Sequence, residues 1–133
     1  MFVNNKELIE ISLFYKKIEK TGMLKIARKI EDVEEKLRGE YSKVVFKMKP
    51  INWKIYNDLQ RSALIDRGTG EGEQIDWIKY KETKLLQILA DWDAKNKDGS
   101  KIPINQETIF NLHPAIAESL LNEYDKKTVL GEE

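Results

Sequence analysis

The sequence predicts a single α+β domain that is mostly α-helical and holds a small two-stranded β element. Three observations favour this fold class. Apolar residues recur at three- and four-residue steps over most of the chain, residues 42–49 alternate apolar and polar side chains, and Pro or Gly separates these stretches. The alternative is an all-α domain in which the extended stretches only connect helices.

Composition narrows the class of protein. The chain has 133 residues, of which 41% are hydrophobic, enough for one domain with its own core. It has no Cys and a single His, which argues against the usual zinc and iron–sulfur sites, and we expect no cofactor. No apolar run approaches the roughly 20 residues that cross a bilayer, and the N-terminus lacks signal-peptide features. We therefore expect a cytoplasmic protein without membrane contact.

Charge is balanced overall but not along the chain. Residues 1–67 carry 15 Lys+Arg and 10 Asp+Glu, net +5, whereas residues 68–133 carry 8 and 13, net −5. Opposite charges allow the two halves, or two copies of the chain, to attract each other, so a homo-oligomer is one expectation. A dedicated nucleic-acid binder more often has an overall basic excess, which makes nucleic acid a poor candidate partner.

The N-terminal region, residues 1–40, is predicted to form two amphipathic helices. The first spans residues 6–20, capped by Asn5 and ended by Thr21 and Gly22. The second begins at Met23 and is expected to end at Gly39 in a left-handed cap. Its apolar stripe could pack on the core or bind a partner, and it consists of Ile26, Ile30, Val33 and Leu37.

Residues 41–66 are predicted to form a strand, a turn and a helix. Residues 42–49 alternate, with Val44, Phe46 and Met48 expected to face the core. Pro50 ends the strand, and Asn52 is a natural N-cap for a helix over residues 53–65. The other side of the strand suits edge protection or a partner surface, because it carries Lys43, Val45, Lys47 and Lys49.

Residues 67–73 hold three glycines in five positions, which predicts a flexible linker. A phosphate-binding loop is disfavoured there, because the segment lacks Gly-Lys-Ser/Thr and carries two glutamates. The linker separates the basic half of the chain from the acidic half.

Residues 74–125 are predicted to be helical with one short extended segment. The longest helix covers residues 74–95, and a turn at Asp98 and Gly99 follows. Residues 101–104 are expected to be extended and to lie along the edge of the strand at 42–49. Asn105 caps a short helix over residues 106–111, and Pro114 starts another that reaches about Tyr124. The tail, residues 126–133, is expected to fray.

The sequence offers no recognisable catalytic constellation. His113, the one His, precedes Pro114 at a helix entrance, where a capping or solvent-facing role is favoured over catalysis. Trp53, Trp77 and Trp92 could form a base-stacking platform, but two of them sit within or beside helical apolar stripes, which favours core packing. We therefore expect no enzymatic activity and no metal site.

Two stretches carry a family resemblance. Residues 45–59, Val-Phe-Lys-Met-Lys-Pro-Ile-Asn-Trp-Lys-Ile-Tyr-Asn-Asp-Leu, resemble the strand, Pro-containing turn and helix of tail assembly chaperones of long-tailed bacteriophages. Ile88-Leu-Ala-Asp-Trp-Asp, followed by the Asp98-Gly turn, Ile-Pro-Ile-Asn and Leu-His-Pro up to Leu121, is similar to the second half of such proteins. The resemblance covers about half of the chain and lacks a counterpart for the segment before residue 40.

The resemblance implies a protein without catalytic activity that acts in the host cytoplasm. Such a protein binds the long tape-measure protein and helps to recruit tail-tube subunits. Two other functions remain open, namely a structural protein of the virion, such as a head–tail connector or neck component, and a small nucleic-acid-binding regulator. Partner binding would use the amphipathic residues 23–37 and the basic strand at 42–49.

Overall fold

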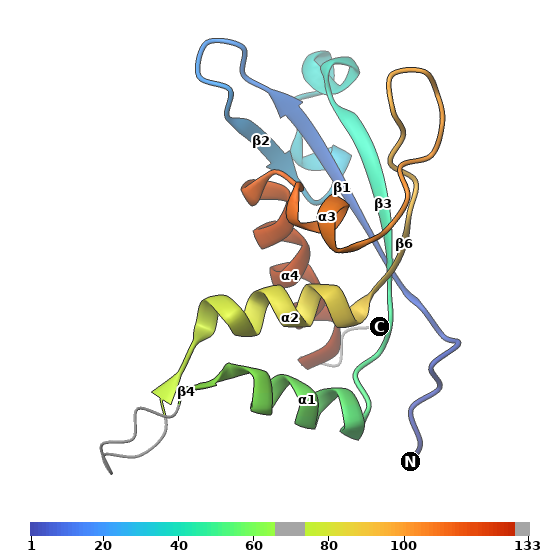
Figure 1. The fold of residues 1–133 in the computed structure, drawn as a ribbon. Helices are drawn as coiled ribbons and strands as arrows, with labels where there is room; N and C mark the ends of the chain where they lie inside the picture. Colours follow the sequence, from blue (N-terminus) through green and yellow to red (C-terminus); the bar gives the residue numbers. More distant parts are fainter. Residues whose placement is uncertain (66–73, 130–133) are drawn as a thin grey trace.

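The computed structural model describes residues 1–65 and 74–129, and its centre is a four-stranded antiparallel sheet of order β2-β1-β3-β6 (Figure 1). The chain is α+β, with about 44% helix and 24% strand, so the prediction of a mostly helical domain with a two-stranded β element is wrong. The all-α alternative is wrong as well. The strands of the sheet are β1 (Ile9–Lys17), β2 (Leu24–Ala27), β3 (Ser42–Met48) and β6 (Leu89–Trp92).

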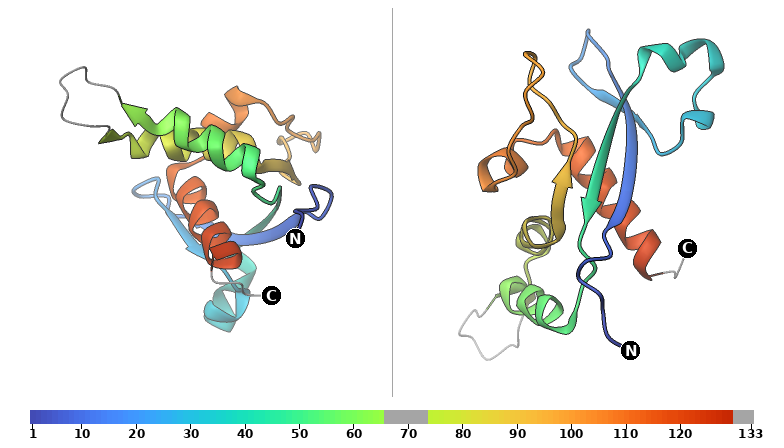
Figure 2. Two further views of the ribbon diagram at one scale, coloured as in Figure 1. Left: turned by 90° about the horizontal axis from the view of Figure 1, so that it is seen from below. Right: turned by 90° about the vertical axis from the view of Figure 1, so that its right-hand side faces the viewer.

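Helices cover one face of this sheet. The long helix α4 (Pro114–Val129) runs across the sheet, while α1 (Trp53–Ala63) and α2 (Trp77–Ile88) lie side by side and project from it (Figures 1 and 2). A short antiparallel pair, β4 (Leu64–Ile65) and β5 (Gln74–Ile75), follows α1 and precedes α2. The helical elements are η1 (Ile30–Asp32), η2 (Glu35–Glu40), α1 (Trp53–Ala63), α2 (Trp77–Ile88), α3 (Gln106–Phe110) and α4 (Pro114–Val129).

Strand β1 replaces the helix predicted over residues 6–20. Six of the eight residues from Leu8 to Tyr15 are apolar, so this stretch fits a period of two as well as a helical period. A helix would have buried the stripe through Phe14 and left Leu13 off it. Pairing with β3 instead buries Ile11 and Leu13 completely. Pairing with β3 therefore decides that this segment is a strand and not a helix.

The second predicted helix is also absent. Residues 24–27 form β2, which pairs with β1 through a hairpin, and two 3₁₀ helices follow. Gly22 supplies the hairpin turn with φ of 71°, a conformation that glycine adopts at no steric cost. Gly39 lies inside η2 and has no positive φ, so the predicted left-handed cap is wrong.

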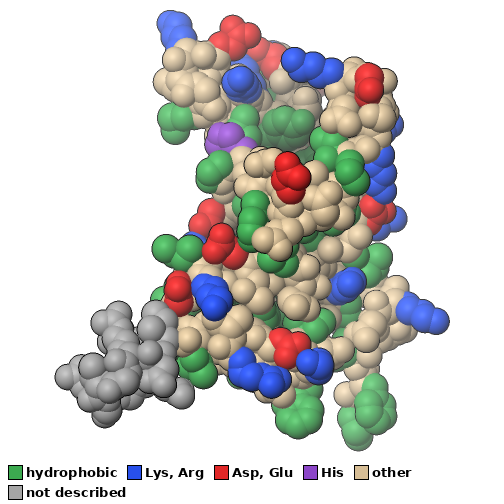
Figure 3. Space-filling model, viewed as in Figure 1, with side chains coloured by type: hydrophobic (Ala, Val, Ile, Leu, Met, Phe, Trp, Pro, Cys, Tyr) green, Lys and Arg blue, Asp and Glu red, His purple; other side chains and the backbone are tan. Residues whose placement is uncertain are grey.

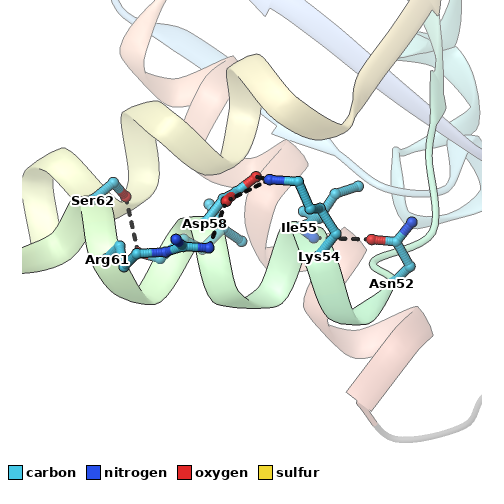
Figure 4. Close-up of polar contacts among 7 residues, drawn as sticks. Asn52, Lys54, Ile55, Asp58, Arg61 and Ser62 are labelled. Carbon is cyan, nitrogen blue, oxygen red and sulfur yellow. Dashed lines mark hydrogen bonds and ion pairs between the residues drawn. The ribbon is translucent and has the colours of Figure 1, made fainter.

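The strand–turn–helix unit at residues 42–63 is confirmed. Val44, Phe46 and Met48 of β3 are buried, and the Asn52 side chain accepts a 2.9 Å hydrogen bond from the Ile55 N–H at the start of α1 (Figure 4). On the outer side of α1, Asp58 pairs with Lys54 and Arg61 (Figure 4). Local signals, namely the alternation of residues 42–49 and the Asn52 cap, are sufficient to predict this unit.

The helix predicted over residues 74–95 is shorter than expected. It ends at Ile88, and residues 89–92 form β6, which takes the place beside β3 that was predicted for residues 101–104. Residues 101–104 pair instead with the segment after β6, through a Lys95–Lys101 bridge and a bond from the Ile102 N–H to the Ala94 carbonyl. The Asp98–Gly99 turn is confirmed, with Gly99 at φ of 89°.

The C-terminal helices begin as predicted. Asn105 and Thr108 form a capping box at α3, and Pro114 opens α4. Helix α4 extends to Val129, so the prediction of a frayed tail is wrong for residues 126–129. Residues 130–133 and the predicted linker at residues 67–73 lie outside the described residues.

The core lies between the sheet and helices α2, α3 and α4. Tyr124 is the largest fully buried side chain. Trp77, for which core packing was favoured, is instead 62% exposed, and its neighbour Ile78 is 72% exposed. The core cluster consists of Ile11, Leu13, Val44, Phe46, Met48, Leu85, Ile88, Leu89, Trp92, Ile109, Ile116, Leu120, Leu121 and Tyr124.

Candidate partner-binding surfaces

The basic strand predicted as a partner surface lies in the interior of the sheet. Strand β3 is paired on both sides, with β1 and with β6, so it is not an edge and its lysines do not protect one. Because side chains alternate along a strand, Lys43, Val45 and Lys47 lie on the face opposite the core. Lys49 follows the strand and is exposed.

One of these lysines, Lys47, has acidic neighbours that the sequence did not indicate. The register places Lys47 opposite Glu10 on β1 and Asp91 on β6. Lys43 lies instead beside an aromatic side chain, with its Nζ 5.8 Å from the centre of the Phe14 ring. The outer face of the sheet therefore carries both signs of charge and differs from the purely cationic surface that was predicted.

Val45 is one of the residues that line a hollow of about 240 Å³. Its N–H donates to the Asp93 carboxylate at 2.8 Å, and its carbonyl accepts from the Asp93 N–H at 3.2 Å. At the rim, the Lys101 ammonium bonds Asp91 at 2.5 Å, and this bond, with one from the Trp92 N–H, lowers the pKa of the Asp91 carboxyl. Asp91 is thus held as a carboxylate.

The second predicted surface has a different structure from the amphipathic helix that was expected. Ile26 is on β2, Ile30 is in η1, Val33 is buried between the two 3₁₀ helices, and Leu37 is in η2. Three of them, Ile26, Val33 and Leu37, line one polar-rimmed hollow of about 450 Å³. Ile30 is not among its lining residues, so the structure brings three of these four residues together.

A third surface, which was not predicted from the sequence, lies between three helices. Helices α2, α3 and α4 enclose an apolar groove of about 410 Å³, with Leu85, Ile109 and Leu121 at its buried side. Ile78 and Phe110 line the same groove and are 72% and 46% exposed. Hydrophobic side chains are visible on this face of the molecule (Figure 3).

The groove has a charged rim and an aromatic neighbour. Lys81 on α2 and Glu118 on α4 line it and form a 2.6 Å ion pair. Trp77 lies one position before Ile78 on α2 and packs edge-on against Tyr80, with ring centres 5.6 Å apart. One signal for this surface is present in the sequence, because residues 75–78 hold more apolar side chains than one helix face can bury. No local pattern marks Phe110.

His113 has the capping role favoured from the sequence. Its Nδ1 accepts a 3.1 Å hydrogen bond from the Ala115 N–H, and its carbonyl accepts from the N–H groups of Ile116 and Ala117 in the first turn of α4. Within residues 1–65 and 74–129, no three His, Asp or Glu side chains are grouped closely enough to hold a metal ion. In the same ranges no helix has the length and apolar character needed to cross a membrane.

Comparison of the chain with protein-family models, with curated proteins and with solved structures gives no match.

Proposed function

We propose that this protein is a non-catalytic tail assembly chaperone of a long-tailed bacteriophage, which binds the tape-measure protein and assists assembly of the tail tube. The tape-measure protein is proposed as the partner because residues 45–59 and 88–121 resemble segments of tail assembly chaperones. The order of elements in the two resembling segments supports membership of this chaperone family. In the first segment β3, the Pro50 turn and α1 follow one another, and in the second the Asp98–Gly99 turn leads to α3 and α4.

The observation that carries the proposal is the exposed apolar groove between α2, α3 and α4. Interface centres in protein complexes are rich in aromatic and aliphatic side chains and poor in charge. Ile78 and Phe110 are large, exposed and adjacent to a concave apolar floor, which is the arrangement that a partner's apolar side chains fill. Covering such side chains releases about 25 cal/mol for each Å² of apolar area removed from water.

Co-purification with the tape-measure protein tests the proposal. We expect a tagged form of this chain to capture the product of the long reading frame downstream of its gene. Replacing Ile78 and Phe110 together with Asp should abolish capture with the fold intact, because both side chains are exposed. Trp53→Asp is the matched control, since Trp53 is 81% exposed on a different helix. Undiminished capture by a folded Ile78→Asp, Phe110→Asp variant would remove the groove from the proposal.

The basic sheet face gives a second, independent variant. Lys43→Glu with Lys49→Glu reverses two exposed charges and leaves Lys47 between its two carboxylates. If the tape-measure protein uses this face, capture should fall in this variant and become less dependent on salt, because charged contacts are screened by ions. Circular dichroism confirms folding. Capture equal to that of the unmodified chain would exclude the sheet face.

The two alternatives predict other results. A connector or neck component is retained in purified virions, whereas a chaperone is absent from them, so mass spectrometry of purified particles separates these functions. A nucleic-acid-binding regulator binds DNA with an affinity that falls steeply as salt rises. Either result would contradict the proposal.

A further inference from the structure

Strand β1 has an unpaired edge along half of its length. It pairs with β3 from Ile9 to Tyr15, but with β2 only from Phe14 to Lys17. From Ile9 to Leu13, the side of β1 that faces away from β3 therefore has no strand beside it in the described part of the chain. No strand of the described residues fills the position that a continued β2 would occupy.

The ladder shows which backbone groups face this opening. The Ile18 N–H donates to the Met23 carbonyl at 2.7 Å, so Ile18 and Met23 are a hydrogen-bonded pair. Because such pairs alternate with non-bonded ones in an antiparallel ladder, the even-numbered residues of β1 direct their N–H and C=O groups toward β2. Where β1 has no β2 residue beside it, the even-numbered residues are Ser12 and Glu10. The Lys127 ammonium reaches the Glu10 carbonyl at 2.9 Å from that side, which agrees with this assignment.

The opening is a crevice of about 760 Å³ with a basic wall. Residues 10–12 of β1 form one side, and the other sides come from the residues after β2 and from the last turns of α4. Four cations and two carboxylates line it. Glu123 is already bonded by Arg28 at 2.9 Å and lies 3.8 Å from Lys126. The lining residues are Glu10, Ile11, Ser12, Arg28, Lys29, Glu123, Lys126 and Lys127.

We propose that this crevice binds an extended acidic segment of a protein partner, which adds as a strand to β1 between Ile9 and Leu13. The inference rests on the proposed function in one respect, namely that the protein acts by binding a protein. Strand addition satisfies the outward N–H and C=O of Ser12, and the net positive lining attracts carboxylates. At about 3.3 Å per residue, the open edge accommodates about five residues of an extended peptide.

Titration with a model peptide tests the inference without the tape-measure protein. The probe is the hexapeptide Glu-Val-Glu-Val-Glu-Val, with a Lys-Val hexapeptide and a backbone N-methylated Glu-Val hexapeptide as controls. We expect only the first to bind, with an affinity that falls as salt rises, and we expect it to slow hydrogen exchange at the Ser12 amide. Binding of the N-methylated peptide with equal affinity would overturn strand addition, and so would an absence of binding by the first peptide.

Charge reversal tests the basic wall. Lys29→Glu with Lys126→Glu should weaken binding of the Glu-Val peptide by at least about tenfold. Lys20→Glu with Lys97→Glu changes the net charge equally at exposed positions outside the crevice and should leave the affinity within about twofold. Equal weakening by the two variants would mean that net charge, and not the crevice, attracts the peptide.

The chain itself supplies one competing occupant, because residues 130–133 include Glu132 and Glu133 and follow α4 directly. A chain ending at Val129 should bind the peptide as the whole chain does. Faster Ser12 exchange and tighter peptide binding in the shortened chain would identify its own terminus as the occupant and overturn the partner proposal. Peptide binding without tape-measure capture would contradict the proposed function alone, and capture without peptide binding would contradict this inference alone.

Discussion

The Tyr124 hydroxyl donates a 2.7 Å hydrogen bond to the carbonyl oxygen of Lys49, 75 residues earlier in the chain. Lys49 follows β3, and its N–H bonds the Ile88 carbonyl at the end of α2. The backbone N–H and carbonyl of Lys49 therefore connect the end of β3 to α2 and α4, at the point where the chain leaves the sheet for α1. The ring of Tyr124 is fully buried in the core, so this bond also satisfies a polar group that has no access to water.

Replacing Tyr124 with Phe should lower the free energy of unfolding by about 1–2 kcal/mol, because the hydrogen bond is lost and the Lys49 carbonyl loses a partner. The measurement is urea unfolding monitored by circular dichroism. Tyr56→Phe is the control, since Tyr56 is 53% exposed, and it should change stability by less than about 0.5 kcal/mol. Equal stability of the two variants would contradict the role of the bond.

The same tyrosine predicts a dependence of stability on alkaline pH. Burial, assisted by the charge of Asp125, raises the pKa of Tyr124 to about 12 from the ordinary value of 10. The unfolded chain therefore releases the proton at a lower pH than the folded chain. The stabilisation is complete below about pH 10 and is lost as the pH rises from 10 to 12. Unfolding curves of Tyr124→Phe should lose less stability over this range than those of the unmodified chain, and parallel losses would contradict the assignment.

The buried Lys84 should be a further source of stability. Its ammonium bonds Asp125 at 2.5 Å and lies 5.6 Å from the ring centres of both Tyr80 and Tyr124. Lys84→Met keeps the apolar stem and removes the charge, and we expect it to cost about 1–2 kcal/mol. Lys81→Met removes the exposed pair with Glu118 and should cost less than about 1 kcal/mol. Thermal or urea unfolding of both variants checks the difference, and a reversed order would be inconsistent with the packing of Lys84.

Two tryptophans should respond very differently to truncation. Trp92 is 3% exposed and donates from Nε1 to the Ile102 carbonyl at 2.7 Å, so Trp92→Ala should cost about 3–5 kcal/mol. Trp53 is 81% exposed, and Trp53→Ala should cost less than about 0.5 kcal/mol. Chemical denaturation measures both. A large loss in Trp53→Ala would mean that this side chain is covered in solution, for example by a second copy of the chain.

Lys47 should be the lysine of β3 that is least tolerant of charge reversal. It lies opposite both Glu10 and Asp91, and Lys47→Glu would place three carboxylates in one row across the sheet. Like charges directly opposite each other destabilise a sheet, and we expect a cost of about 0.5–1 kcal/mol that shrinks at high salt. Lys49→Glu, at an exposed position after the strand, should cost less than about 0.5 kcal/mol. A salt-independent cost at Lys47 would contradict this explanation.

The sequence by itself determined the elements whose signals are local. Asn52 begins α1, Asn105 begins α3, Pro114 begins α4, and Asp98 with Gly99 makes a turn, because each side chain acts on backbone groups within a few residues. The alternation over residues 42–49 likewise identified β3 and its buried side. Such features need no knowledge of the rest of the chain.

Only the tertiary structure decided the elements whose partners are distant in sequence. Residues 9–17 and 89–92 carry enough apolar side chains to satisfy a helix or a strand, and pairing with β3 on either side selects the strand. The same pairing sets charged neighbours, such as Glu10 and Asp91 opposite Lys47, and, among residues 1–65 and 74–129, leaves about half of the β1 edge without a partner strand. It also decides that Trp92 is buried while Trp53 and Trp77 are exposed, since burial depends on what packs above a helix face and not on its periodicity.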